Sequence, residues 1–284
     1  MTRRAMFPAL MARARVDLAK RAARGTLSPH SRSSWQAGQF SPLASRVLVV
    51  SPHLDDAIFS LGAAMASHIR NGGSVTVLTV LAGDPNTSEP AATWDRLSGF
   101  TTARESVLAR RCEDKEACSV IGVAPIHLDG QDGQYSPARD DDSLGAAIRL
   151  AAARHDEVLV PGHPLHHPDH EYVNRLTLAA LVPGTRIRLY AEEPYTAWLR
   201  RSAAADLMED SSTEPAGWGS VLAGASAIRL KALAASKYRS QLPPLTGMPT
   251  LGAAANAARA RFIGLLWHEA RTRGELISAP IRHD

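Results

Sequence analysis

The first strong pattern in the chain is a run of four apolar residues at positions 47–50. This run is short and rich in β-branched residues, which predicts a buried strand of a parallel sheet. From Asp56 onward, apolar residues recur at helical spacing until the stop signal Asn71-Gly72-Gly73. A second strand is expected at residues 75–81. These segments predict a strand–helix–strand unit at the front of a domain.

Alternating strand and helix patterns continue to about residue 191. The further strands are expected at residues 126–128, 158–160 and 186–191, and the further helices at about 102–121, at about 143–154 and from near His170. A polar loop is expected at residues 83–99. After residue 191, Ala-rich helices alternate with a proline-containing loop at residues 242–249. This order predicts an α/β fold with a doubly wound, mostly parallel, Rossmann-like sheet flanked by helices.

Charge and composition divide the chain into an arm and one domain. The first forty residues carry eight basic residues and one acid, and residues 25–42 have the composition of a linker. Residues 1–42 are therefore interpreted as a basic arm and linker, and residues 43–284 as a single α/β domain. Pro8 and Arg13 interrupt the apolar part of the arm, which favours a surface element over a targeting signal.

Several classes of protein are not expected from the composition. The chain has 32 basic and 28 acidic residues, and no basic stripe interleaves with aromatic residues, so nucleic-acid binding is not expected. No apolar window approaches the length of a transmembrane segment. The two cysteines, Cys112 and Cys118, are too few for a disulfide framework and are expected to be reduced thiols of a cytoplasmic protein. The sequence leaves the oligomeric state open.

Two polar clusters directly follow two of the predicted strands. The first is Ser51-Pro52-His53-Leu54-Asp55-Asp56, and the second is His163-Pro164-Leu165-His166-His167-Pro168-Asp169-His170. In a doubly wound sheet, ligands bind beyond the carboxyl ends of the strands, where such turns can converge. Together the clusters offer imidazoles and carboxylates, the nitrogen and oxygen ligands that suit zinc.

The spacing within the first cluster suggests different roles for its residues. His53 and Asp56 lie three positions apart at a helix entry, so both can point at one ion. Asp55 must point differently, which suits a base beside a metal-bound water. A catalytic zinc needs three protein ligands, and two from the first cluster with one from the second would supply them. The structural alternatives are a helix cap for Asp55 and a dipole-favoured position for Asp56, and His163 and His166 are interpreted as loop histidines.

The two clusters together resemble the signature of a known family. Pro52-His53-Leu54-Asp55-Asp56 resembles the His-Pro-Asp-Asp-Glu motif of the PIG-L (LmbE-like) zinc N-deacetylases, and His167-Pro168-Asp169-His170 matches their His-x-Asp-His motif. Similar stretches occur at residues 110–122, 132–133, 189–195 and 237–241, so the likeness runs from about residue 46 to 267. Two separated motifs in the right order make the resemblance specific.

The resemblance implies a zinc-dependent hydrolase that removes an N-acetyl group from an amino sugar or glycoconjugate. It implies one zinc ion per chain, held by His53, Asp56 and His170. It also implies that Asp55 is the general base of the reaction.

The resemblance assigns further roles to the second cluster and to two distant residues. His167 is implied as the cation that stabilises the oxyanion, oriented and tuned by Asp169, because a neighbouring carboxylate raises the pKa of an imidazole. Arg110 and Asp132 are candidates for holding sugar hydroxyls.

Two departures from the family motif leave alternatives open. Leu54 replaces a proline, and Ala57 replaces the closing glutamate, which weakens the expected support around the ligands. The alternatives are a non-catalytic sugar-binding relative and a metal hydrolase of the same fold acting on a different amide. The chain lacks the motifs of zinc proteases, nucleobase deaminases, nicotinamide-binding folds and serine hydrolases.

Overall fold

The computed structural model describes residues 42–85, 89–135, 139–201, 218–246 and 253–281. The basic arm and linker expected at residues 1–42 lie outside this part of the chain, apart from Pro42. Parts of the two expected loops, residues 86–88 and 247–249, also lie outside it. Among the helices that the structure describes, none has the length and apolar character needed to cross a membrane.

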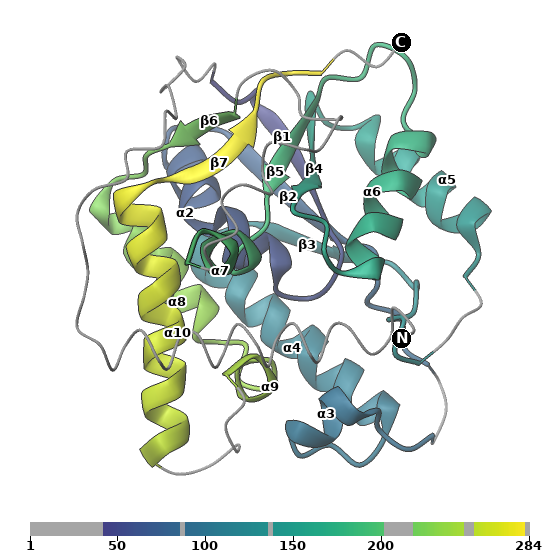
Figure 1. Ribbon diagram of the computed structural model, residues 1–284. Coiled ribbons are helices and arrows are strands. Elements are labelled where there is room, and N and C mark those ends of the chain that lie inside the picture. Colours follow the sequence, from purple (N-terminus) through teal and green to yellow (C-terminus); the bar gives the residue numbers. More distant parts are fainter. Residues whose placement is uncertain (1–41, 86–88, 136–138, 202–217, 247–252, 282–284) are drawn as a thin grey trace.

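Within the described residues, seven strands form one sheet in the order β3-β2-β1-β4-β5-β7-β6 (Figure 1). The strands are β1 (Arg46–Ser51), β2 (Ser74–Thr79), β3 (Ala124–His127), β4 (Glu157–His163), β5 (Ile187–Ala191), β6 (Trp218–Val221) and β7 (Glu275–Ser278). Strands β1 to β5 run parallel, whereas β7 pairs antiparallel with both β5 and β6. The doubly wound, mostly parallel sheet predicted from the sequence is therefore confirmed.

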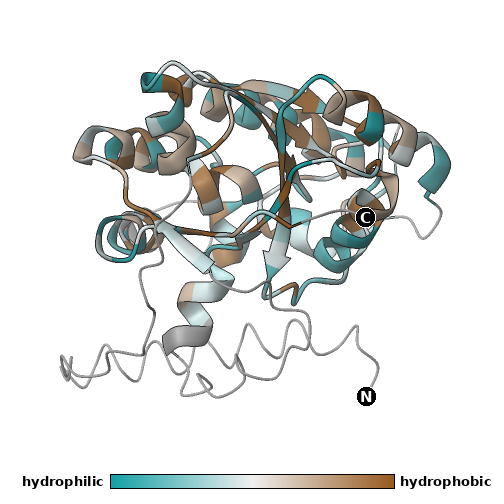
Figure 2. Ribbon diagram, turned by 90° about the horizontal axis from the view of Figure 1, so that it is seen from above, coloured by the Kyte–Doolittle hydropathy of each residue, from teal (hydrophilic) through white to brown (hydrophobic). Residues whose placement is uncertain are grey.

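Helices cover both faces of this sheet (Figure 1). The helices of the described chain are α2 (Asp56–Arg70), α3 (Thr93–Leu97), α4 (Ala103–Ile121), α5 (Asp141–Ala152), α6 (Pro168–Ala180), α7 (Tyr195–Arg201), α8 (Ala225–Ala235), α9 (Leu242–Thr246) and α10 (Ala253–Thr272). Alternate residues of β1 point to opposite faces of the sheet. Val47 and Val49 pack with α2, α4, α8 and α10, while Leu48 and Val50 pack with α5 and α6. Figure 2 shows the hydrophobic strands enclosed between these helices.

The chain reverses its direction of travel across the sheet between β1 and β4. From β1 it proceeds outward to β2 and β3, then returns to pair β4 with the other side of β1 and continues to β5. The loops on the two sides of such a switch point leave a crevice beyond the carboxyl ends of the strands. Both polar clusters start here, because each begins with the last residue of its strand, Ser51 of β1 and His163 of β4.

Four short elements are missing from the sequence prediction. Strands β6 and β7 have only four residues each, and runs this short carry little periodic signal. The loops expected at residues 83–99 and 242–249 contain the five-residue helices α3 and α9. Helix α9 includes Pro243 and Pro244, which are tolerated because the first turn of a helix has no intrahelical partner for its N–H groups.

The two cysteines differ in burial, and we therefore expect their thiols to differ in reactivity. Cys112 is exposed on α4, whereas Cys118 is fully buried in the core. Burial raises the pKa of the Cys118 thiol above its ordinary value, and nearby Asp114 raises it further. Because the thiolate is the reactive form, iodoacetamide is expected to modify only Cys112 in the folded protein and both cysteines in denaturant. Mass spectrometry measures this, and rapid labelling of Cys118 in the folded state would contradict it.

Candidate metal centre

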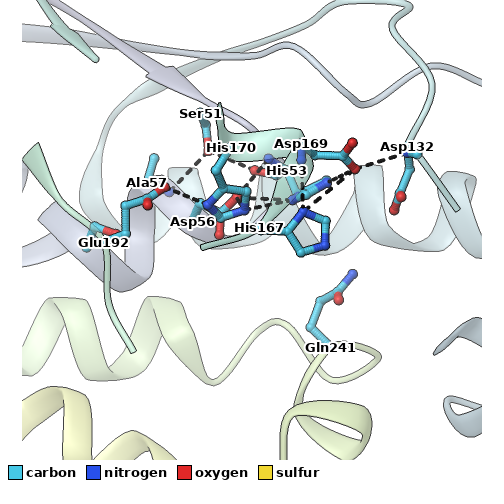
Figure 3. A network of polar contacts seen from close by, with 12 residues as sticks. Ser51, His53, Asp56, Ala57, Asp132, His167, Asp169, His170, Glu192 and Gln241 are labelled. Atoms are coloured by element: carbon cyan, nitrogen blue, oxygen red, sulfur yellow. Dashed lines mark hydrogen bonds and ion pairs between the residues drawn. The ribbon is translucent and has the colours of Figure 1, made fainter. Parts of the chain in front are cut away.

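The turn after β1 is closed by hydrogen bonds among its own residues (Figure 3). The hydroxyl of Ser51 donates to the carbonyl oxygen of His53 at 2.7 Å and accepts from the N–H of Ala57 at 3.1 Å. The N–H of His53 donates to Oδ2 of Asp56 at 2.9 Å. This last bond holds the Asp56 carboxylate beside the His53 ring.

The second cluster forms the start of α6. His167 caps the helix, because its Nδ1 accepts from the N–H of Asp169 at 3.2 Å. Pro168 occupies the first turn, where a proline is favoured because no N–H is needed. Asp169 and His170 follow in the same turn and are both buried. The cap therefore directs these two side chains into the crevice beside the first cluster.

Three ligand atoms from the two clusters face one another, and we call His53, Asp56 and His170 the ligand triangle. Oδ2 of Asp56 lies 3.3 Å from Nδ1 of His53 and 3.3 Å from Nε2 of His170, and the two nitrogens are 3.2 Å apart. In a tetrahedral zinc site with bonds of 2.0–2.1 Å, neighbouring ligand atoms lie about 3.3 Å apart. The three atoms have the spacing of one face of such a tetrahedron. The residues present therefore fit a zinc ion.

The surroundings of the ligand triangle keep its carboxylate ionised. Asp56 is 6% exposed and His170 is 1% exposed. Burial opposes the ionisation of Asp56, but the fields of His170 and His53 and a hydrogen bond from His53 lower its pKa to about 2. A buried anion that faces two imidazoles favours the binding of a cation.

The second nitrogen of each imidazole in the triangle donates to a buried carboxylate. Nε2 of His53 donates to Oδ2 of Asp169 at 3.1 Å, and Nδ1 of His170 donates to Oε1 of Glu192 at 2.5 Å. Asp169 also accepts from Nη2 of Arg139 at 2.5 Å. In metal sites such carboxylates fix the tautomer of a ligand histidine and leave its other nitrogen for the metal.

Asp55 lies beside the ligand triangle, at the N-cap position of α2. It precedes α2, but its side chain makes no capping hydrogen bond. Burial and the neighbouring charge of Asp56 raise the pKa of Asp55 to about 8. A carboxyl with a pKa near neutrality can take up and release a proton within the ordinary working range of an enzyme.

His167 lies next to the two imidazoles of the triangle and extends toward Gln241 (Figure 3). Its ring centroid is 5.2 Å from that of His53 and 5.1 Å from that of His170. Burial, with the fields of His53 and His170, lowers the pKa of His167 to about 3. In the metal-free protein this pKa favours a neutral ring, whereas the resemblance implies a cation at this position. The hydrogen of a neutral ring lies on Nε2, because Nδ1 accepts from the N–H of Asp169. The Asp169 carboxylate, expected from the sequence to tune His167, is bonded to His53 and lies 3.9 Å from Nδ1 of His167.

The two residues expected to hold sugar hydroxyls have different surroundings. Arg110 is 6% exposed and forms an ion pair with the buried carboxylate of Asp95. Asp132 is half-buried in the loop after β3. The next residue, Gly133, donates its N–H to Oδ2 of Asp169 at 3.0 Å. This hydrogen bond places the loop that contains Asp132 next to Asp169 at the site. Arg110 instead has its guanidinium group in a buried ion pair with Asp95.

Comparison with known proteins places this site in a family. The sequence model of the PIG-L family, described as GlcNAc-PI de-N-acetylase, matches residues 48–181, which include the whole ligand triangle and Asp55. Over these residues the chain belongs to the PIG-L family. It is 32% identical over 53% of its length to 2'-N-acetylparomamine deacetylase of Streptomyces fradiae, of which the match covers 57%.

A second curated relative of this PIG-L protein is 1D-myo-inositol 2-acetamido-2-deoxy-alpha-D-glucopyranoside deacetylase 1 of Catenulispora acidiphila. The two are 29% identical over 49% of each chain. The PIG-L chain thus spans about half the length of the curated relatives it matches. A solved structure, a triple mutant of a deacetylase of the teicoplanin biosynthetic pathway, matches 84% of this chain and 98% of its own, with 26% identity and a TM-score of 0.66.

The two departures from the family motif leave the ligand triangle of this PIG-L protein complete. Ala57 is 2% exposed and packs in the apolar core beneath the site. Its N–H still closes the turn through Ser51. Leu54 is 4% exposed, so it contributes apolar packing where the motif has a proline. Neither substitution removes a ligand atom.

Three residues at this site have no role in the sequence prediction. Arg139 donates a hydrogen bond to Asp169, and Glu192 accepts one from His170. Gln241 accepts from Nε1 of Trp94 at 3.2 Å, and its side chain points toward His167 (Figure 3). Glu192 and Gln241 fall in stretches that resemble the family, so the sequence pointed to these segments but not to a function for either residue. Arg139 falls in no such stretch.

The two histidines interpreted as loop residues do not join the ligand triangle. His163 is the last residue of β4, and its ring packs against Trp218 at a centroid distance of 6.2 Å. His166 is exposed. Within the described chain, neither belongs to a group of side chains spaced to hold a metal ion.

Proposed function

We propose that this PIG-L protein is a zinc-dependent hydrolase that removes the acetyl group from an N-acetylated amino sugar or glycoconjugate. The observation that carries the proposal is the ligand triangle at the switch point of the sheet, with the buried Asp55 beside it. The curated relatives support the substrate class. Both are named as deacetylases, one of an N-acetylated compound and one of a 2-acetamido-2-deoxyglucopyranoside.

In this proposal His53, Asp56 and His170 hold one zinc ion per chain. When bound, the ion lowers the pKa of a coordinated water to about 7 and polarises the carbonyl of the substrate. Asp169 and Glu192 keep the two imidazoles in the tautomers that leave Nδ1 of His53 and Nε2 of His170 for the ion.

Asp55 is the proposed general base. It takes a proton from the water whose oxygen attacks the carbonyl carbon of the acetamide. As the carbon–nitrogen bond breaks, Asp55 gives the proton to the departing nitrogen, so the products are acetate and a free amine. Its raised pKa suits both steps, because proton transfer is most efficient when the pKa lies near the working pH.

His167 is the proposed stabiliser of the oxyanion. Its neutral ring donates from Nε2 to the carbonyl oxygen as that atom gains negative charge. Asp169 supports His167 through its backbone N–H, while its carboxylate orients His53. Half-burial favours Asp132 for direct contact with sugar hydroxyls, whereas the ion pair with Asp95 favours an indirect role for Arg110.

Metal analysis combined with an activity assay tests the proposal. The purified protein is expected to hold about one zinc ion per chain and to release acetate from members of a panel of N-acetylated amino sugars. A chelator is expected to abolish this release, and added zinc to restore it. Acetate release that persists in metal-free protein would contradict the proposal.

The same experiment separates the two alternatives. The absence of both bound metal and activity would favour a non-catalytic sugar-binding relative, the alternative that Ala57 raises. Chelator-sensitive release from simple acetamides, without release from any sugar of the panel, would favour a metal hydrolase of the same fold acting on a different amide.

A further inference from the structure

Glu192 is a buried carboxylate that contacts the ligand triangle from outside. It is 1% exposed and directly follows β5, whose neighbour β4 leads into the second cluster. Its Oε1 accepts from Nδ1 of His170 at 2.5 Å, and its Oε2 accepts from the N–H of Leu165 at 3.0 Å. Two parts of the second cluster therefore donate hydrogen bonds to the same carboxylate. This carboxylate lies on the side of the His170 ring that faces away from His53 (Figure 3).

The charge of Glu192 needs a partner because ionised carboxylates are rarely buried unless they are paired or lie near a metal. His170 pairs with Glu192 through Nδ1 and with Asp56 through Nε2. The imidazole thus lies between two carboxylates.

The chain adopts an unfavourable backbone conformation where it meets Glu192. Leu165 has a φ of 52°, and among the described non-glycine residues it is the one with a positive φ. The left-handed conformation is disfavoured for a side chain like leucine, and it persists where the surroundings hold it in place. In this conformation the N–H of Leu165 donates a hydrogen bond to Oε2 of Glu192. The loop that leads to His167 is therefore anchored on the carboxylate that also holds His170.

We propose that Glu192 is a positioning residue that sets how tightly the ligand triangle binds its metal. By accepting the hydrogen on Nδ1, Glu192 holds His170 in the tautomer whose Nε2 lone pair faces the metal, and it adds negative charge behind the ring. The inference rests on the proposed metal site and extends it to a residue outside the ligand set.

The full-length protein with Glu192→Gln tests this inference. Glutamine has nearly the same size, but it lacks the charge, and its single carbonyl oxygen cannot replace both carboxylate oxygens. The affinity for Zn²⁺, measured by competition with a chromophoric chelator, is expected to fall about 10- to 100-fold. Circular dichroism and thermal unfolding of the metal-free protein verify that the variant is folded. A merely structural role for Glu192 would lower thermal stability and leave the affinity of the folded protein unchanged.

Glu171→Gln is the matched control. Glu171 is exposed on α6, next to His170 in the sequence, and the substitution removes the same charge. Its Zn²⁺ affinity is expected to stay within about two-fold of the wild type, because solvent and salt screen exposed charges.

Equal affinities of Glu192→Gln and the wild type would overturn the inference, and so would an equal loss in both variants. A wild-type protein that binds no Zn²⁺ would overturn the proposed function itself, which is a separate result. If Glu192→Gln does not fold, Glu192→Asp takes its place, because it keeps the charge but is one methylene too short to reach both partners. Weakened Zn²⁺ binding in that variant supports the inference, and unchanged binding overturns it.

Discussion

Asp55→Asn is expected to lower the rate of acetate release by about 100-fold or more while the protein keeps its zinc. Asparagine has nearly the same size as Asp55 but cannot take up the proton from the attacking water. Asp55 is not one of the residues whose atoms form the ligand triangle, so the metal content is expected to be unchanged. The turnover number and the zinc content of the same preparation provide the measurement.

The same substitution is expected to leave the melting temperature of the metal-free protein at neutral pH unchanged or to raise it. Burial and the charge of Asp56 raise the pKa of Asp55 to about 8 in the folded protein, well above the value of about 4 in an unfolded chain. A carboxyl with a higher pKa in the folded state opposes folding once the pH exceeds the unfolded value, because it ionises more easily in the unfolded chain. A neutral asparagine removes this opposition. A large loss of activity without a loss of stability would show that Asp55 serves catalysis and does not stabilise the fold.

Two outcomes would contradict the proposed role of Asp55. Full activity in Asp55→Asn would exclude it as the base. Loss of zinc together with activity would instead make Asp55 a metal ligand, and the ligand triangle would then be incomplete as described.

Asp56→Ala is expected to weaken Zn²⁺ binding by more than the roughly 10- to 100-fold loss typical of residues outside the ligand set, such as Glu192. The substitution removes one of the three ligands and the only carboxylate of the triangle. Acetate release at low zinc concentration is expected to fall with the metal content. Competition with a chelator measures the affinity, and added zinc shows whether activity returns at high concentration.

The structural alternative for Asp56 predicts a different result. A carboxylate in the first turn of a helix contributes only about 0.3 to 1 kcal/mol through the helix dipole, so it would change the melting temperature slightly and leave zinc binding intact. Asp156→Ala is the matched control, because Asp156 directly precedes β4 and forms an exposed ion pair with Arg46 at 2.6 Å. Its Zn²⁺ affinity is expected to equal that of the wild type. Unchanged Zn²⁺ binding in Asp56→Ala would show that the metal does not bind at the ligand triangle.

Much of the sheet could be predicted because a parallel strand covered on both faces leaves a continuous apolar run. Residues 47–50 and 158–160 are such runs, and they became β1 and β4. β6 could not be predicted in this way because its four residues are all only partly buried. Its place in the sheet depends on pairing with β7, a strand more than fifty residues later in the chain. A local pattern carries no information about such a distant partner.

The candidate site, like the sheet, could be predicted from the sequence only in part. The sequence by itself determined that His53, Asp56 and His170 follow the carboxyl ends of two parallel strands, because the alternation of strands and helices predicts a parallel sheet whose carboxyl ends share one edge. That the two strands are neighbours, β1 beside β4, was decided by the tertiary structure. Only the tertiary structure decided which carboxylate each imidazole meets. Nε2 of His53 bonds to Asp169, a residue 116 positions away, and His170 turns its Nδ1 to Glu192. The orientation of a ring follows from the packing of segments that are distant in the chain, and no spacing along the sequence encodes it.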